Sequence, residues 1–578
     1  MKTEATDKTT DQSKTDETRP QASAKQMPFQ KYKSFEPVHL TDRTWPDQTI
    51  TEAPRWCSVD LRDGNQALVD PMTPDEKMKM YRLLVEIGFK EIEVGFPAAS
   101  QPDFDFVRRI IEDNLIPEDV TIQVLCQARQ ELIERTCEAV MGAKQVIFHL
   151  YNSTSTLQRR VVFNMGREEV IKLATDGAEL VKKHADELKV AGTHVTLEYS
   201  PESYTATELD FAVDICAAVM DVWQPTAEDK TILNLPSTVE MATPNIYADQ
   251  LEWFIRHLPG RDNAVISLHT HNDRGTGVAA SELGLMAGAE RIEGTLFGNG
   301  ERTGNCDVIN MAMNLFSQGV DPKLYLADMP RIVEVSEACT KIPLHVRTPY
   351  AGELVFTAFS GSHQDAIRKG MSVVDTGGDA QWEVPYLPID PSDVGGSYRE
   401  TVRVNSQSGK GGVAFILEHY FGVALPRELL VEFSPIVQQL TEQKEGELKP
   451  DEIWQAFVSE FIEVEGPYVL IDYDLTSKGG LQTIEARITV AENQLTVTGS
   501  GSGPIDAFIA AMVETLNEPL NVVDYQEYAL NEGSEAQAIC ILALIDDQER
   551  RHYGVGISQS TVTAAFRSII ASINRKWR

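Results

Sequence analysis

Two histidines, His269 and His271, follow the apolar run Ala264–Leu268, which is typical of a buried strand. Side chains two positions apart on a strand point to the same side, so both imidazoles leave this run in parallel. Held in this way, the pair can bind one divalent metal ion. The same spacing also fits two ordinary polar residues at a strand end, and other parts of the chain must decide between these interpretations.

A carboxylate and an amide elsewhere in the chain extend this set of ligands. Asp63 lies in the segment Asp60–Gln66, and Asn305 ends the segment Gly298–Asn305. Asp63 and the histidine pair offer oxygen and nitrogen ligands and leave coordination positions open for water and substrate, as a catalytic ion requires. Asn305 can add a carbonyl oxygen. We predict a site for Mg²⁺, Mn²⁺ or Zn²⁺ that polarises a carbonyl group, and the residue types do not distinguish these ions.

Arg62, next to Asp63, can donate hydrogen bonds to a developing alkoxide or enolate oxygen. Glu93 can pair with Arg62 and hold the plane of its guanidinium group. A purely structural ion pair between Arg62 and Glu93 is the alternative.

Apolar, β-branched runs alternate with amphipathic helical segments from Trp56 onward. One of the helices has a clear start, since Thr73-Pro-Asp-Glu76 offers an N-cap, a proline at the first helical position and a capping-box glutamate. Eight strand–helix units in a row predict a (β/α)8 TIM barrel, with a doubly wound open sheet as the alternative. The predicted strands are Trp56–Asp60, Glu91–Phe96, Thr121–Cys126, Gln145–Leu150, His194–Glu198, Thr231–Leu235, Ala264–Leu268 and Arg291–Phe297.

In such a barrel, chemistry lies at the C-terminal ends of the strands. Polar or ionisable groups follow seven of the predicted strands, whereas a purely structural barrel needs only solvated loops there. This gathering favours a catalytic rim. Besides Asp60–Gln66, the histidine pair and Gly298–Asn305, it includes Glu93, His149, Glu198, Glu202, Ser237 and Thr238.

The composition narrows the classes of partner. The net charge of the 578 residues is −35, which argues against nucleic acid or an anionic membrane. We find no apolar run of membrane-spanning length and no signal peptide. The seven cysteines are an odd number without a CxxC pair, which suits the reducing cytoplasm.

The chain divides into five predicted parts. The first is rich in Thr, Asp, Lys, Gln and Ser, which predicts a largely disordered tail. A barrel, a mostly helical subdomain, a charged helical connector and an α+β domain follow. The ranges are 1–45, 46–320, 321–425, 426–465 and 466–578.

The last part repeats a sheet-plus-helix pattern, which predicts internal pseudo-symmetry. A cleft between the halves can hold a small ligand, and a packing or dimerisation domain is the alternative. We expect turns at Gly499–Gly503 and Gly554–Ser560. Tight turns are also expected at Gly298–Gly304 and Ser408–Gly412, which match neither a dinucleotide-binding motif nor a P-loop.

Four motifs resemble the acyl-CoA-condensing branch of the metal-dependent TIM-barrel lyases and synthases: Leu61–Gln66, Glu93–Pro97, His269–Asp273 and Gly298–Asn305. This branch includes 2-isopropylmalate, homocitrate and citramalate synthases, with hydroxymethylglutaryl-CoA lyase as a cousin. The resemblance runs from about Arg55 to the C-terminus. The length, the N-terminal extension and the segment Phe356–Ile367 are most similar to the long form of the 2-isopropylmalate synthases.

The resemblance implies that a divalent cation binds Asp63, His269, His271 and Asn305. It implies condensation of acetyl-CoA with 3-methyl-2-oxobutanoate in leucine biosynthesis, with L-leucine as a feedback inhibitor bound by residues 466–578. It also implies a homodimer, in which the helical subdomain of one subunit reaches over the barrel mouth of the other. That subdomain would supply a His and a Tyr, which match His363 and Tyr386, although a lone His after Gly-Ser is usually a loop residue.

For this condensation, we expect Thr238 and His149 to help bind the 2-oxo acid and Arg62 to stabilise the new alkoxide. Glu202 and His363 are candidates for the base or its relay, with Tyr386 as a proton donor. Asp506 and Glu532 are candidates to receive the leucine ammonium group. A homocitrate or citramalate synthase and a non-catalytic amino-acid sensor remain as alternatives.

Overall fold

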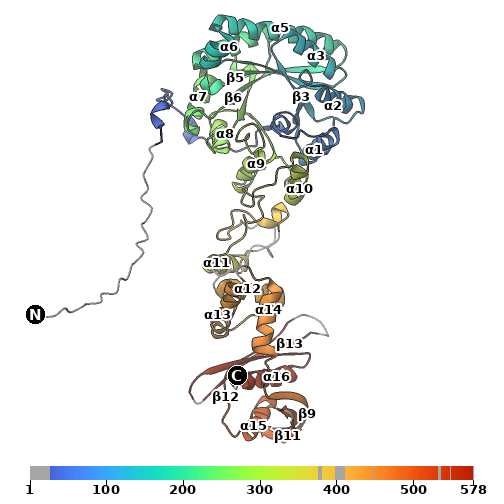
Figure 1. Cartoon of the computed structure of the whole chain (residues 1–578), viewed down its shortest axis with the longest axis vertical. Coiled ribbons are helices and arrows are strands. Elements are labelled where there is room, and N and C mark those ends of the chain that lie inside the picture. Colours follow the sequence, from blue (N-terminus) through green and yellow to red (C-terminus); the bar gives the residue numbers. More distant parts are fainter. Residues whose placement is uncertain are drawn as a thin grey trace, which may run out of the picture.

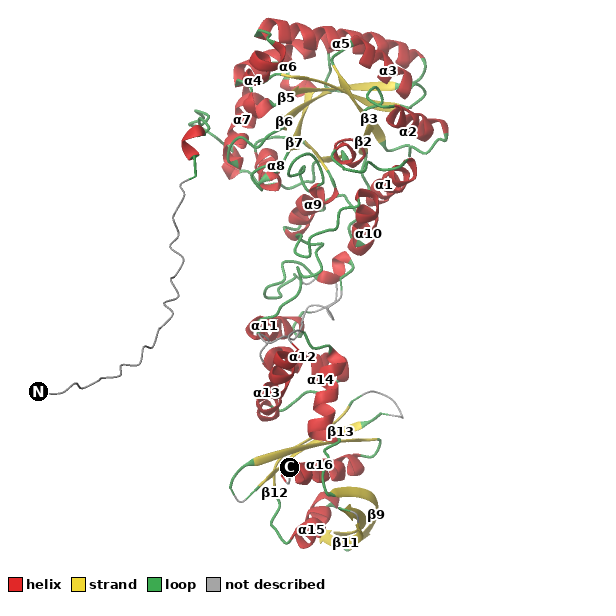
Figure 2. Cartoon of the chain, viewed as in Figure 1, coloured by secondary structure: helices red, strands yellow, loops and turns green. Residues whose placement is uncertain are grey.

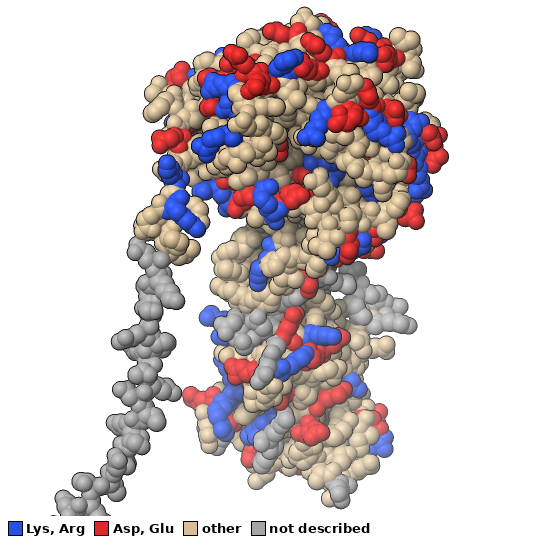
Figure 3. All heavy atoms as spheres, turned by 45° about the horizontal axis from the view of Figure 1, so that its top comes forward, with Lys and Arg blue, Asp and Glu red and all other residues tan. Residues whose placement is uncertain are grey.

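The computed structural model describes residues 27–374, 381–396, 410–444, 447–491, 493–530, 536–546 and 548–576. The molecule is elongated (Figure 1). A barrel lies at one end, a small α+β domain lies at the other, and helices and loops connect them. On the face shown in Figure 3, acidic and basic side chains are interspersed over the barrel. Within the described ranges, no helix combines the length and apolar character needed to cross a membrane.

Eight parallel strands form a closed barrel, in which each strand pairs with the next and β1 pairs with β8 (Figure 2). This confirms the predicted TIM barrel and rules out the open sheet. The strands are β1 Arg55–Ser58, β2 Glu91–Gly95, β3 Thr121–Gln127, β4 Gln145–Ser153, β5 His194–Glu202, β6 Thr231–Ser237, β7 Ala264–Thr270 and β8 Arg291–Gly294.

Helices surround the barrel and bury an apolar layer against its outer face. The predicted capping box is present at the start of α1, where the Thr73 hydroxyl and the Glu76 carboxylate each accept a backbone N–H. The helices are α1 Pro74–Ile87, α2 Gln101–Glu112, α3 Gln130–Val140, α4 Thr156–Gln158, α5 Arg167–Val190, α6 Leu209–Trp223, α7 Pro244–His257, α8 Gly277–Met286, α9 Val308–Ser317 and α10 Met329–Thr340.

The predicted strand ends all differ from the structure by one to four residues, and three of the differences bear on the site. Strand β1 stops at Ser58, and a single π-helical turn, η3 (Asp60–Gly64), follows it. Strands β4 and β5 continue past their predicted ends because they stay paired as far as Ser153 and Glu202. His149 and Glu198 therefore lie opposite each other inside the barrel and not at its rim.

The predicted N-terminal tail ends in a docked segment. Arg43 donates two hydrogen bonds of 2.8 and 2.7 Å to Asp249 on α7, and the Trp45 indole N–H donates a third of 2.8 Å to the same carboxylate. The last residues of the predicted tail therefore pack against α7, and an averaged composition does not reveal such single anchoring side chains. Residues 1–26 of the predicted tail lie outside the described residues.

The middle of the chain has fewer helices and more loops than the pattern predicts. Its helices are α11 Gly361–Met371, α12 Lys410–Phe421, α13 Arg427–Lys444 and α14 Pro450–Phe457, followed by the π-helical turn η10 Val458–Ile462. A tight turn was expected at Ser408–Gly412. Lys410 to Gly412 form the first turn of helix α12, and Ser408 and Gly409 lie outside the described residues. A Cβ on Gly412 would lie 2.2 Å from the Gln364 amide oxygen, so the glycine lets α12 press against α11.

The C-terminal domain contains two antiparallel three-stranded sheets, ordered β11-β10-β9 and β12-β13-β14. Each sheet is followed by one helix, which confirms the predicted internal repeat. Helices α12 to α14 pack on the second sheet and share an apolar core with it. The elements are β9 Tyr468–Lys478, β10 Leu481–Val490, β11 Asn493–Gly501, α15 Pro504–Leu516, β12 Asn521–Ala529, β13 Ala538–Ile545, β14 Arg551–Ser558 and α16 Thr561–Lys576.

The glycines predicted as turns lie mostly within strands. Gly499 is part of β11, and Gly556 is part of β14. A Cβ on Gly499 would lie 2.3 Å from the carbonyl oxygen of Ala507, and a Cβ on Gly556 would lie 2.0 Å from that of Ala564. Each half of the domain therefore uses glycine to bring its helix directly onto its third strand.

Candidate active site

A pocket of about 350 Å³ opens at the C-terminal ends of the barrel strands. Side chains from β4, β5, β6, β7 and the loops between strands and helices line it. Seven of the predicted site residues are among them: Arg62, Asp63, His149, Glu202, Thr238, His269 and His271.

Asp63, His269 and His271 form a buried cluster in this pocket. One ligand atom of each lies within 4.8 Å of the others, and Asp63 Oδ2 is 3.4 Å from His269 Nε2 and 3.9 Å from His271 Nε2. Asp63 Oδ2 accepts no hydrogen bond from the described residues. A buried carboxylate oxygen without a partner is costly, so the cluster is suited to bind a cation.

Asn305 lies beside this cluster, because its backbone forms an isolated β-bridge with His271. Its side chain is buried and donates from Nδ2 to the Asn299 carbonyl oxygen at 3.3 Å. Its Oδ1 has no hydrogen-bond donor in the described parts of the chain. A second unpartnered oxygen thus accompanies the carboxylate and the two imidazoles, a set that fits a divalent ion.

The two histidines of the cluster differ in pKa because their electrostatic surroundings differ. Burial disfavours the charge on Asp63, but Arg62 and the histidines outweigh burial and hold the Asp63 pKa well below its usual range. Burial likewise opposes the His269 imidazolium, yet the nearby carboxylates of Asp63 and Glu293 raise its pKa to about 9. Burial and the neighbouring His269 charge lower the pKa of His271 to about 4, so this imidazole is neutral.

Arg62 is fixed on two sides. Its NH1 donates to Asp63 Oδ1 at 2.7 Å, and its Nε donates to Glu93. Glu93 is fully buried below the pocket and also accepts from His149 Nδ1 at 2.8 Å. The guanidinium group is therefore held beside the cation cluster in one orientation, as predicted for a group that stabilises negative charge.

A second group of acid and histidine side chains, Glu93, His149 and Glu293, lies inside the barrel. Gln123 fills its centre, since its Nε2 donates to Glu93 and Glu293 at 2.7 and 2.8 Å and lies 3.2 Å from His149 Nδ1. The amide nitrogen thus occupies the place of an ion, and this group is a hydrogen-bonded part of the core.

Glu202 and Thr238 lie at the rim of the pocket. Glu202 ends β5 and accepts a hydrogen bond from the Ser153 hydroxyl. Thr238 follows β6, and its Oγ1 accepts a hydrogen bond of 2.9 Å from the backbone N–H of Ser203. The Thr238 hydroxyl proton can therefore be donated to a ligand in the pocket.

His363 and Tyr386 do not line this pocket. They stack on each other with ring centroids 3.9 Å apart, on and near α11 in the middle of the molecule (Figure 1). A single chain therefore does not combine them with the cation cluster.

Some of the residues that build the site were not predicted from the sequence. Gln123, Asn234 and Glu293 interrupt apolar strand runs, and such interruptions were the available signal. Their side chains point into the barrel and hydrogen-bond beneath the pocket. Phe96, Leu125 and Pro236, which form an apolar part of the pocket wall, are also new.

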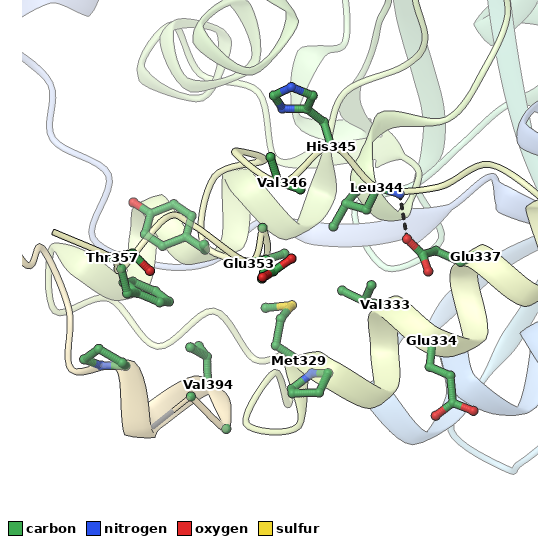
Figure 4. A pocket seen from close by; sticks show the side chains of 18 residues that line it. Met329, Val333, Glu334, Glu337, Leu344, His345, Val346, Glu353, Thr357 and Val394 are labelled. Carbon is green, nitrogen blue, oxygen red and sulfur yellow. Dashed lines mark hydrogen bonds between the residues drawn. The ribbon is translucent and has the colours of Figure 1, made fainter. Parts of the chain in front are cut away.

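A larger cavity of about 500 Å³ lies between α10 and the loops around residues 344–357 and 391–396 (Figure 4). Apolar side chains such as Met329 and Val394 form much of its wall, and Glu337 accepts a hydrogen bond from the Leu344 backbone at 2.6 Å. Its lining residues include no group of clustered acid and histidine side chains like that at the barrel mouth, which is therefore the candidate active site.

Three family models match successive parts of the chain. They are "HMGL-like" at residues 53–336, "Alpha-isopropylmalate synthase, post-catalytic domain-like" at 353–418, and "LeuA allosteric (dimerisation) domain" at 447–577. The three matches follow the order of barrel, middle segment and C-terminal domain seen in the structure.

Several curated relatives are similar over nearly the whole chain, and all bear the name 2-isopropylmalate synthase. The one from Parafrankia sp. (strain EAN1pec) is 54% identical over 96% of this chain and 98% of its own. Those from Clostridium acetobutylicum and Rhodospirillum rubrum are 52% and 53% identical over 95% of this chain, and over 99% and 98% of their own.

The cation cluster can be tested directly. We expect Asp63→Ala to remove most Mn²⁺ binding, because it deletes the only carboxylate among the predicted ligands, while the thermal unfolding profile stays close to that of the unchanged protein. Calorimetric titration of the metal-free protein with Mn²⁺ measures this. Glu301→Gln, which changes another acid that lines the pocket, is the control and should bind Mn²⁺ normally. Equal Mn²⁺ binding by Asp63→Ala and the unchanged protein would contradict the assignment.

Proposed function

The chain belongs to the 2-isopropylmalate synthase family, and from this premise we propose that it condenses acetyl-CoA with 3-methyl-2-oxobutanoate. The products are 2-isopropylmalate and CoA, and the reaction serves leucine biosynthesis. The observation that carries the proposal is the likeness over 96% of the chain to relatives that bear this name. The buried cluster of Asp63, His269 and His271 supports it, because such a condensation needs stabilisation of negative charge on oxygen.

In the proposed site, Asp63, His269, His271 and Asn305 hold a divalent cation. When bound, the cation supplies Lewis-acid polarisation of the keto group of the 2-oxo acid. The unpartnered oxygens of Asp63 and Asn305 are the features that support this assignment. The residue types do not select among Mg²⁺, Mn²⁺ and Zn²⁺.

The remaining pocket residues position the reactants. The Thr238 hydroxyl donates a hydrogen bond to the carboxylate of the 2-oxo acid, and His149 contacts the same substrate. Glu202 takes a methyl proton from acetyl-CoA, and the carbon electron pair left behind forms the new bond to the keto carbon. Arg62 donates hydrogen bonds to the keto oxygen as it becomes an alkoxide, and this alkoxide then takes up the proton that Glu202 removed. Water then attacks the thioester carbon, and CoA leaves as the thiol.

The apolar wall of the pocket favours 3-methyl-2-oxobutanoate over the substrates of sister synthases. Phe96, Leu125 and Pro236 can surround an isopropyl group, whereas the distal carboxylate of 2-oxoglutarate needs a cationic partner. A non-catalytic sensor would not need the fixed Arg62 or the cation cluster.

We expect CoA release to be fastest with 3-methyl-2-oxobutanoate and to stop when EDTA removes the cation. The measurement is thiol trapping of CoA, with 3-methyl-2-oxobutanoate, 2-oxoglutarate and pyruvate compared by kcat/KM. A higher kcat/KM for either of the other two acids would assign the chain to a sister activity. No CoA release with any of them would favour the sensor.

We also propose that His363 and Tyr386 act at the barrel mouth of a second subunit. Two observations support this. The pair stacks away from the pocket of its own chain, and a family model for an allosteric dimerisation domain matches residues 447–577. His363 would then relay a proton in the active site of the partner.

A mixing experiment tests this arrangement. His363→Ala and His271→Ala should each be inactive alone, and subunit exchange between them should restore activity because one mixed site has both residues intact. CoA release is followed after denaturation and joint refolding of the two variants. Refolding each variant alone is the control. Mixed dimers that form but stay inactive would place both residues in a site made by one chain.

We propose that residues 466–578 bind L-leucine as the end-product inhibitor. The LeuA family model supports this, together with a short turn at Ser502 and Gly503 directly before the N-terminus of α15, which can offer backbone N–H groups to a carboxylate. Asp506 on α15 accepts a hydrogen bond from Ser502 and remains a candidate for the ammonium group. Glu532, the other candidate, lies outside the described residues.

L-leucine should bind the intact chain and slow CoA release, with a coupling free energy of about 1–3 kcal/mol between the two sites. Calorimetry and steady-state kinetics measure this, with D-leucine as the control. Deleting residues 466–578 is a poor test, because β13 and β14 share a core with α12 to α14. If L-leucine gives no heat of binding and no inhibition, the proposed regulation is wrong.

A further inference from the structure

Glu293, on β8, accepts four hydrogen bonds inside the barrel, where it is almost completely buried. Its Oε1 accepts from Gln123 Nε2 at 2.8 Å and from Arg291 NH1 at 3.0 Å. Its Oε2 accepts from Asn234 Nδ2 at 3.1 Å and is 2.8 Å from His269 Nδ1. Four groups thus converge on one carboxylate.

This arrangement fixes where the protons lie. An ionised carboxylate can only accept hydrogen bonds, so His269 Nδ1 must carry the proton that the two share. The buried Arg291 guanidinium group, whose NH1 lies 3.0 Å from Glu293 Oε1, compensates the negative charge of this carboxylate. The proton therefore stays on His269 Nδ1, and Nε2 is the atom left for a cation.

The ring is also oriented correctly for this role. His269 Nε2 is the nitrogen that faces Asp63 Oδ2, at 3.4 Å. A histidine that donates through one nitrogen is held both in its tautomer and in its ring plane, which strengthens the other nitrogen as a metal ligand. We propose that Glu293 is the positioning residue that holds His269 as a cation ligand. This inference rests on the cation site of the proposed function.

An amide cannot replace the carboxylate. Gln123 is locked in its own orientation, because its Oε1 accepts from Arg291 NH2 at 2.6 Å while its Nε2 donates to Glu293. In Glu293→Gln, the new NH2 group must face either Gln123 and Arg291 or Asn234 and His269. In either orientation the new NH2 group faces other hydrogen-bond donors. If it faces Asn234 and His269, the imidazole loses its acceptor; if it faces Gln123 and Arg291, their hydrogen bonds in the barrel core are lost.

A matched control exists on the same arginine. Glu91 is also buried and accepts from Arg291 Nε at 2.5 Å, but its other partner is Arg55, and among the described residues it has no hydrogen bond with His269. Glu91→Gln therefore weakens the barrel core without touching the cation ligand. A purely structural role for Glu293 predicts similar Mn²⁺ affinities in the two variants.

The experiment is calorimetric titration of the metal-free full chain with Mn²⁺. Glu293→Gln should bind Mn²⁺ about 10–100-fold more weakly than the unchanged protein, as expected when a partner of a ligating histidine is lost. Glu91→Gln should bind as the unchanged protein does. Unchanged affinity in Glu293→Gln, or equal losses in the two variants, would overturn the proposal.

Two further measurements keep the outcome decisive. If Glu293→Gln does not fold, Glu293→Asp keeps the charge beside Arg291 and draws the oxygen away from His269. It should also bind Mn²⁺ more weakly, and normal binding would overturn the proposal. In a His269→Ala background, Glu293→Gln should cause no additional loss. If the unchanged protein does not bind Mn²⁺, or if Asp63→Ala binds it equally well, the cation site itself fails, and that result is distinct from failure of the role of Glu293.

Discussion

The ion pairing of Arg291 inside the barrel is the interaction on which the site depends. Its guanidinium group is fully buried and donates to Glu91, Glu293, Ser267 and Gln123. TIM barrels usually fill this space with branched apolar side chains. Here the buried positive charge of Arg291 allows carboxylates to remain ionised below the pocket, since an unpaired buried carboxylate would be neutralised or would destabilise the fold. One of these carboxylates, Glu293, reaches His269, the proposed cation ligand.

The same network joins the two chemical functions of the pocket. Gln123 donates to Glu293, which holds His269, and to Glu93, which holds Arg62. The positions of His269, the proposed cation ligand, and of Arg62, the proposed stabiliser of negative charge, are therefore not independent. Side chains at the rim can vary with the substrate, whereas this buried layer must stay complete for both functions to stay aligned.

The fold and the cation cluster could be predicted because they depend on local signals. Strand periodicity gave the barrel, and the barrel brought Asp63 to the histidine pair from across the sequence. The interior network could not be predicted, because Gln123 and Glu293, 170 residues apart, meet only through the register of the strands, and the sequence does not reveal that register. The glycines of β11 and β14 are predicted as turns but lie in strands, because the sequence does not reveal that a helix packs over each strand. His363 lies away from the pocket of its own chain, a separation that its place after Gly-Ser in the sequence does not reveal.

The middle of the molecule links the C-terminal domain to α11 mechanically. Helices α12 to α14 share their core with the second sheet, and α12 lies directly against α11, where an ion pair joins Arg368 and Glu418 at 3.4 Å. The described residues 341–360, between α10 and α11, form loops. The helix that carries His363 is therefore connected to the C-terminal sheet by continuous packing, so a shift of that sheet on ligand binding would also displace His363.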